Sequence, residues 1–137
     1  MKVFLDTNVL VAAFATRGLC ADVVRLVLAE HDLVVSETIL AELGRVLADK
    51  IGLPNRAVRA VVRFVRQRAT VMPSGSPAPP ITPRDPGDVA VLADALVSGA
   101  EVLVTGDRDL LDLPVQRALR VVDPRGFWEL VNRRPKA

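Results

Sequence analysis

The residues best suited to chemistry in this sequence are acidic side chains that stand beside short apolar segments. Asp6 directly follows the apolar run Val3–Leu5, and Asp107 lies just past a second apolar run. Asp85 and Asp88 stand where an apolar helical pattern begins. Carboxylates that gather in one place repel one another, and hard cations relieve that repulsion. The pattern therefore indicates a metal site, provided that the fold brings these residues together.

Oxygen ligands of this kind favour Mg²⁺ or Mn²⁺ over zinc or copper. A zinc site built from Cys and His within the chain is excluded, because the sequence has one His and one Cys. We expect no lysine beside the carboxylates to neutralise them, since the lysines are only Lys2, Lys50 and Lys136. Hard cations held by carboxylates clamp a phosphodiester and generate the attacking hydroxide, so the expected chemistry is metal-dependent phosphodiester cleavage.

Short apolar strands that alternate with helices must position these residues. The expected strands are Lys2–Leu5, Leu33–Val35, Thr70–Met72, Val102–Val104 and Arg120–Val122. The expected helices are Asn8–Ala15, Ala21–Glu30, a helix capped by Ser36 that runs to about Asp49, Arg56–Arg68, Pro86–Leu96 and Pro124–Val131. This alternation predicts right-handed crossovers and a parallel sheet that helices cover on both faces. Ligands of such sheets bind along the carboxyl ends of the strands.

Length and composition predict one domain over residues 1–137. A chain of 137 residues, half of them hydrophobic, can bury a substantial core. Residues 73–86 hold six of the ten prolines and are expected to form a loop within that domain. The apolar N-terminal run stops at Asp6, which excludes a signal peptide, and no apolar run approaches the ~20 residues of a membrane span. We therefore expect a soluble, cytoplasmic protein.

A structural role is the alternative for several of the acidic residues. Asp85 and Asp88 fit the N-cap and the first turn of a helix, where the helix dipole favours negative charge. Asp109 is equally well explained as a turn or cap residue. Glu42 lies inside a helix, about 80° from its apolar face, and can reach inward, whereas Glu37 at about 140° points to solvent.

Four segments, in order, resemble the acidic motifs of PIN-domain ribonucleases and together span nearly the whole chain. They are Val3–Leu10, Val35–Leu43, Arg84–Ala95 and Val104–Leu111. They resemble most the VapC-like toxin components of bacterial toxin–antitoxin modules. The resemblance implies a three-layer α/β/α sandwich with a central parallel sheet of four to five strands. It also implies Mg²⁺- or Mn²⁺-dependent endoribonuclease activity, homodimerisation and inhibition by a cognate antitoxin protein.

The resemblance also assigns roles to single residues. It implies a catalytic, metal-binding quartet and supporting polar residues: Asp6, Glu42, Asp88 and Asp107, with Thr7, Asn8 and Thr105 in support. Asp85 and Asp109 are further candidate metal ligands. Gly87 and Val89 flank Asp88 where relatives often carry another acidic residue and Asn or Asp. Whether Asp85 or Asp88 is the main third ligand therefore stays open.

Basic residues are expected to hold the RNA, because carboxylates alone repel phosphate. The net charge is only +2, but fifteen of the eighteen basic residues are Arg, which suits phosphate recognition. One face of the expected helix Arg56–Arg68 carries Arg56, Arg59, Arg63 and Arg66, opposite its apolar face. The alternative is the ordinary solvated face of an amphipathic helix.

Two other functions stay open. A haloacid-dehalogenase-like phosphatase also places an Asp after its first strand, but it needs a second Asp at position 8, where this chain has Asn8, and a lysine near the phosphate. The other is a non-enzymatic module. A receiver-like domain needs a phosphoacceptor Asp on its third strand and a late lysine, and neither is apparent. A catalytically inactive PIN-like binding module would lack part of the quartet, which is complete here.

Overall fold

One parallel sheet organises the fold of this protein, whose computed structural model describes residues 1–73, 86–113 and 119–132. Its five strands run in the order β3-β2-β1-β4-β5, and every neighbouring pair is parallel. The strands are β1 (Lys2–Leu5), β2 (Asp32–Ser36), β3 (Thr70–Met72), β4 (Val102–Val104) and β5 (Arg120–Val122). All five predicted strands are confirmed, and β2 is one residue longer at each end.

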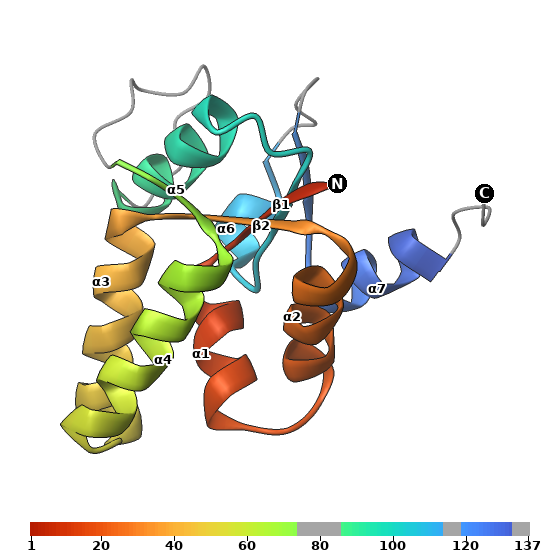
Figure 1. Cartoon of the computed structure of the whole chain (residues 1–137). Coiled ribbons are helices and arrows are strands. Elements are labelled where there is room, and N and C mark those ends of the chain that lie inside the picture. Colours follow the sequence, from red (N-terminus) through yellow and green to blue (C-terminus); the bar gives the residue numbers. More distant parts are fainter. Residues whose placement is uncertain (74–85, 114–118, 133–137) are drawn as a thin grey trace.

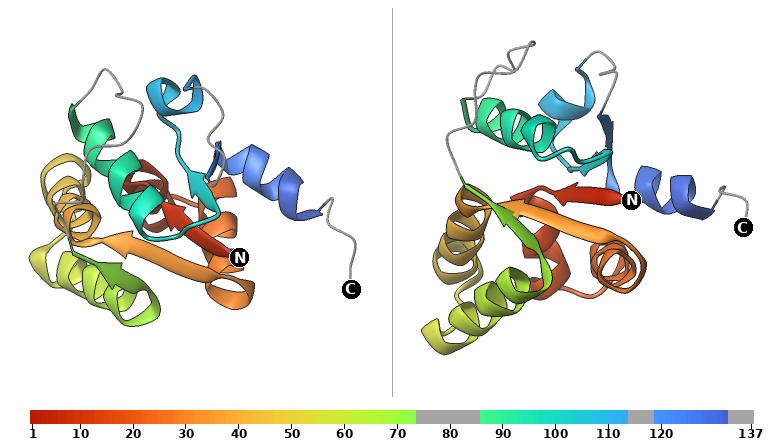
Figure 2. Two further views of the ribbon diagram at one scale, coloured as in Figure 1. Left: turned by 90° about the horizontal axis from the view of Figure 1, so that it is seen from above. Right: turned by 45° about the horizontal axis from the view of Figure 1, so that its top comes forward.

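Helices cover both faces of this sheet, so the predicted α/β sandwich is confirmed. The helices are α1 (Thr7–Ala15), α2 (Leu19–Glu30), α3 (Glu37–Val46), the π-helical turn η1 (Leu47–Ile51), α4 (Asn55–Arg68), α5 (Pro86–Val97), α6 (Arg108–Leu111) and α7 (Pro124–Asn132). In Figure 1, α5 lies above the strands, while α1, α2 and α4 lie below them, and Figure 2 shows the same division. In the segments that the structure describes, no helix is both long and apolar enough to cross a membrane.

The end of α3 departs from the predicted helix. Ser36 caps α3 as expected, since its Oγ accepts a hydrogen bond from the Ile39 N–H at 3.1 Å. After Val46 the chain leaves α-helical geometry and continues as the π turn η1, instead of ending at about Asp49. Gly52 closes η1 in the left-handed conformation, with φ of 79°, which glycine adopts without strain. The short α6 was not predicted. Most of the predicted loop at 73–86, including the N-cap at Asp85, lies outside the described residues.

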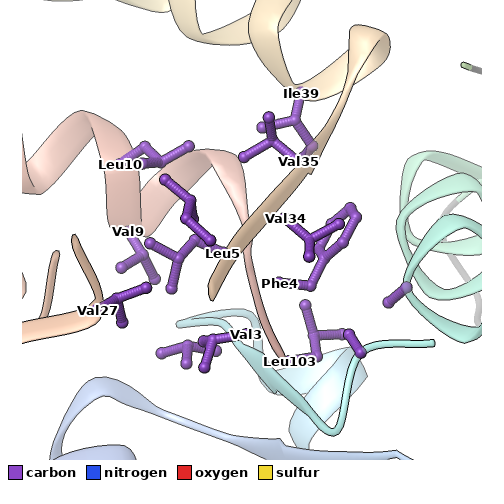
Figure 3. Packing of buried hydrophobic residues seen from close by; sticks show 14 of the residues in the cluster. Val3, Phe4, Leu5, Val9, Leu10, Val27, Val34, Val35, Ile39 and Leu103 are labelled. Carbon is purple, nitrogen blue, oxygen red and sulfur yellow. The ribbon is translucent and has the colours of Figure 1, made fainter. Parts of the chain in front are cut away.

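The core lies on both sides of the sheet, because strand side chains alternate between its faces. In β1, Val3 and Leu5 face Val9 of α1 and Val27 of α2, whereas Phe4 points to the opposite face (Figure 3). None of these five side chains is more than 1% exposed. A shift of β1 by one residue would reverse the faces of all three strand residues, so burial fixes the register of β1. It thereby fixes the position of the residue that follows β1.

The substitution Val3→Ala should lower the free energy of unfolding by about 2 kcal/mol, because it removes buried methyl groups and leaves a cavity. The matched control Val97→Ala removes the same atoms from a side chain that is 58% exposed, and should change that free energy by no more than about 0.5 kcal/mol. Urea denaturation followed by circular dichroism measures both. Equal losses in the two variants would contradict the placement of β1 in the core.

Candidate metal centre

The carboxyl ends of β1 and β4 meet at the point where the crossovers of the sheet diverge. The chain builds β2 and β3 on one side of β1, and it adds β4 and β5 on the other side. Parallel sheets bind ligands at such a switch point, because neighbouring crossovers turn away from each other and leave a crevice. Leu5 pairs with Val104, so the next residues, Asp6 and Thr105, lie side by side at this edge.

Hydrogen bonds fix the Asp6 carboxylate at this edge. The Thr105 hydroxyl donates to Asp6 Oδ2 at 2.7 Å, and the Thr7 N–H donates to Asp6 Oδ1 at 2.7 Å. Thr105 Oγ1 in turn accepts a hydrogen bond from the Asp107 N–H at 3.0 Å. Asp6 is only 7% exposed, and Thr105 is fully buried. One buried threonine therefore joins the acidic residues that follow two neighbouring strands.

Burial raises the pKa of the Asp6 carboxyl above its ordinary value, because a buried charge loses its hydration. The hydrogen bonds from Thr105 and Thr7 act in the opposite direction, and the charges of Asp107 and Glu42 raise the pKa further. The protein by itself thus stabilises the Asp6 carboxylate too little to offset its burial. A cation beside Asp6 would favour the ionised form.

Asp88, Asp107 and Asp109 form a tight group of carboxylates at the same edge. Each of them offers one oxygen, and these three oxygens lie within 4.8 Å of one another. Asp88, in the first turn of α5, is buried, Asp107 is half-buried and Asp109 is exposed. Asp107 also caps α6, since its Oδ1 accepts a hydrogen bond from the Asp109 N–H at 2.9 Å. Three negative charges at this spacing repel one another unless a cation lies between them.

A cavity of about 470 Å³ lies beside these carboxylates. All members of the predicted quartet line it: Asp6, Glu42, Asp88 and Asp107. Glu42 reaches the cavity from α3, where it is exposed and its carboxylate lies 3.6 Å from the Arg45 guanidinium. The structure therefore brings together the four residues that the sequence singled out, whereas their catalytic role stays a prediction.

The predicted supporting residues lie at the same place. Thr7 lines the cavity, and its hydroxyl oxygen is buried without a hydrogen-bond partner in the part of the chain that the structure describes. Asn8 lines the cavity too, and its Oδ1 accepts a hydrogen bond from the Gly106 N–H at 3.2 Å, which ties α1 to the segment after β4. Of the two further candidate ligands, Asp109 lies in the carboxylate group, and Asp85 lies outside the described residues.

The sequence matches the family model of the PIN domain over residues 2–109. The chain belongs to the PIN domain family. No curated protein matches it. Among solved structures, its fold is similar to that of a chain in the crystal structure of VapBC2 from Rickettsia felis bound to a DNA fragment from their promoter. The TM-score is 0.62, with 16% sequence identity over 88% of this chain and 97% of that chain.

PIN domains generally use a divalent metal ion, and the side chains of this PIN domain fit one. The donors at the cavity are mainly carboxylate oxygens, which Mg²⁺ and Mn²⁺ prefer. The buried Thr7 hydroxyl adds an oxygen that the described residues leave unsatisfied. A hydrated divalent cation such as magnesium or manganese would satisfy both features, because such ions take carboxylate ligands and keep water molecules that hydrogen-bond to neighbouring groups.

Lys50 of this PIN domain lines the same cavity as the acidic quartet, a position that the sequence does not predict. Its side chain reaches the cavity from η1. Glu42, Val46 and Lys50 follow one another at intervals of four residues, and all three line the cavity. Residues four apart lie near one another on a helix, but over eight residues a regular α-helix turns about 80° past the starting residue, so the sequence alone does not place Lys50 beside Glu42.

The arginine face of α4 lies apart from the cavity. Arg56, Arg59, Arg63 and Arg66 are exposed, and none of them is among the described residues that line the cavity. Arg66 donates two hydrogen bonds to Glu37 of α3, at 2.7 and 2.8 Å, and these bonds lower the pKa of Glu37. This pair connects α4 to α3, so Arg66 has a structural contact. The proposed contact of this face with RNA stays a prediction.

The substitution Asp6→Asn should raise the thermal midpoint of the metal-free PIN domain at neutral pH. The raised pKa of Asp6 means that the folded state binds this proton more tightly than the unfolded state. The resulting stabilisation is complete at low pH and is lost as the pH rises through the folded-state pKa. The asparagine side chain of the variant does not ionise, so the variant escapes that loss.

Calorimetry in EDTA tests this expectation, with the exposed Asp22→Asn as the matched control. The midpoint of Asp6→Asn should exceed that of the parent at pH 7.5, and the gap should close as the pH falls toward about 4, the ordinary pKa of Asp. A gap of the same size at both pH values would show that ionisation of Asp6 is not its cause.

Proposed function

We propose that residues 1–137 form a single nuclease domain that cleaves RNA internally with Mg²⁺ or Mn²⁺. PIN domains are usually nucleases, which supports the reaction class. The observation that carries the proposal is the gathering of the quartet Asp6, Glu42, Asp88 and Asp107 around one cavity at the switch point of the sheet. Carboxylates arranged in this way suit hard cations that clamp a phosphodiester.

We further propose that the protein is the toxin of a bacterial toxin–antitoxin pair. Its four acidic motifs resemble those of VapC-like toxins, and a similar fold occurs in the VapBC2 complex. In this proposal the nuclease acts in the cytoplasm as a homodimer, and a cognate antitoxin protein restrains it until it is needed. The domain presents a cavity that an inhibitory segment could fill.

Different side chains have different roles in the proposed hydrolysis. Asp6, Asp88 and Asp107 would hold the metal, with Asp109 at the exposed side of the group. When bound, the metal polarises a phosphoryl oxygen and lowers the pKa of the attacking water. Glu42, on the opposing helix, has an exposed carboxylate that can accept the proton of that water. Water then adds to phosphorus, the bond to one ester oxygen breaks, and that oxygen takes up a proton.

Neighbouring polar residues keep this arrangement in place. Thr105 and Thr7 hold both oxygens of Asp6 with hydrogen bonds. Each carboxylate oxygen has a second lone pair, so these bonds leave Asp6 able to ligate a metal. Asn8 accepts from the Gly106 N–H, and its amide does not ionise, so it cannot replace the second Asp that a phosphatase of the alternative class needs at this position. The complete quartet gives the inactive binding module no support.

The variant Asp6→Asn should lose Mn²⁺-dependent cleavage of a generic single-stranded RNA by more than about 100-fold, since it removes a ligand charge whose effect is worth several kcal/mol in the transition state. Initial rates of cleavage of a fluorescent RNA measure the loss. Asp22→Asn, with the same change at an exposed position of α2, should keep the rate of the parent. Undiminished turnover in Asp6→Asn, purified free of host nucleases, would falsify the proposed mechanism.

Expression of the parent chain alone should arrest growth of a bacterial host and degrade its RNA, because an unrestrained endoribonuclease acts on cellular RNA. Expression of Asp6→Asn at the same level should leave growth unchanged. Co-expression with the genes next to the native one should restore growth and yield a small protein that co-purifies with the parent chain. Normal growth and intact RNA with soluble parent protein would contradict the toxin assignment while leaving the family assignment untouched.

A further inference from the structure

The cavity beside the carboxylates is a groove whose two ends differ in charge. Carboxylates lie at one end, and Lys50 lies at the other. Residues of α1 line the groove together with residues of α3 and η1, which contact α1. Because α1 follows β1 and α3 follows β2, residues later in each helix lie farther from the carboxyl ends of the strands. The wall of α1 consists of Thr7, Asn8, Val11, Ala12, Ala15 and Thr16, and the opposite wall consists of Glu42, Val46, Lys50 and Ile51. Figure 1 shows α1 and α3 leaving the strands in the same direction. The groove therefore leads from the carboxylates, past an apolar stretch, to Lys50.

Lys50 supplies the positive charge of this groove. Among the described residues that line the cavity, it is the sole basic one, and the other charged ones are Asp6, Glu42, Asp88 and Asp107. Lys50 is exposed. The ion pairs of the described residues join Arg25 to Asp22, Arg45 to Glu42, and Arg66 to Glu37. The ammonium group of Lys50 thus belongs to none of these pairs and is available to a ligand.

The π turn places Lys50 in the groove. In a regular α-helix, Lys50 would stand about 80° around the axis from Glu42, because eight residues exceed two turns. A π turn holds more residues in each turn, so each residue advances less around the axis and Lys50 comes back toward the face of Glu42. The Gly52 N–H donates to the Leu47 carbonyl, which is the five-residue spacing of a π-helix.

The position of Lys50 decides which group it can contact. Eight residues of helix separate the backbone of Lys50 from that of Glu42 by roughly 12 Å along the axis. The Lys50 ammonium, on its flexible stem, can therefore reach a group that lies beyond the one bound at the carboxylates. The apolar side chains between them, such as Val46 and Ala12, suit a sugar or a base edge better than a second phosphate. A compact ammonium on a flexible stem suits a single phosphate oxygen.

We propose that Lys50 binds a backbone phosphate of the RNA that neighbours the scissile one, and so positions the strand along the groove between α1 and α3. This proposal rests on the proposed function, because it takes RNA as the substrate. In this proposal the ammonium group of Lys50 attracts the RNA into the groove, whereas the carboxylates alone would repel a polyanion. Lys50 acts as a positioning residue, and the metal centre is unaffected by it.

The test measures binding of a fluorescent single-stranded RNA by anisotropy in Mg²⁺, over a series of salt concentrations. All variants are made in the Asp6→Asn background, which prevents cleavage. Lys50→Gln should weaken binding about tenfold, because it removes one charge-assisted contact. It should also reduce the slope of log K against log salt by about 0.7, the share of one phosphate on a single strand. Lys50→Arg should keep most of the affinity and the full slope.

Lys2→Gln is the matched control, since Lys2 is an exposed lysine at the amino end of β1, the opposite edge of the sheet. It should bind RNA with the affinity and slope of the background protein. The proposal is overturned if Lys50→Gln binds RNA with the affinity and salt slope of the background protein. If that variant instead weakens binding of a co-purifying protein, Lys50 contacts that protein and not RNA. The two proposals can fail separately. If RNA binding depends on Lys50 but the chain with Asp6 intact shows no Mn²⁺-dependent cleavage, the phosphate contact is supported and only the proposed nuclease activity is contradicted.

Discussion

The hydrogen bond from the Thr105 hydroxyl to the Asp6 carboxylate is the contact on which the metal centre depends. It joins residues 99 positions apart in the chain, and it can form only because β1 and β4 pair in the register that sets Leu5 opposite Val104. The same hydroxyl oxygen accepts from the Asp107 N–H, so one side chain fixes both the carboxylate of Asp6 and the backbone of Asp107. Packing of the apolar strand residues thus determines where the charges lie.

The apparent conflict between a structural and a chemical role for the acidic residues disappears at atomic level. Asp107 caps α6 with Oδ1 and still offers an oxygen to the group that it forms with Asp88 and Asp109. A cap uses one lone pair of a carboxylate, and a carboxylate has about four. The cap also fixes the side-chain rotamer, which lowers the entropy that a bound ion must remove. Capping and ligation therefore support each other at this edge of the sheet.

The sequence predicts the strands and the position of Asp6 from local patterns, whereas the quartet as a set follows from the resemblance to PIN domains and its catalytic role stays a prediction. Short apolar runs define β1 and β4, and the residue after each run must lie at the carboxyl edge of a parallel sheet. The sequence does not predict the π turn, since Leu47–Ile51 has the composition of an ordinary helix end and its geometry depends on the tertiary contacts of α3. The sequence therefore does not place Lys50 either. The ion pair of Arg66 with Glu37 also escapes prediction, because helical periodicity describes one helix and not its neighbour.

The order of the strands has a consequence for the synthesis of the protein. β1 leaves the ribosome before β2, and its neighbour β4 comes only after β2 and β3, about a hundred residues later than β1. Until residues 102–109 have been translated, Asp6 has no Thr105 to hold it and Asp88 has no Asp107 beside it. The carboxylates of a nascent chain are therefore separate until β4 has been made. Vectorial synthesis thus completes the acidic edge of the sheet late, once β4 can pair with β1.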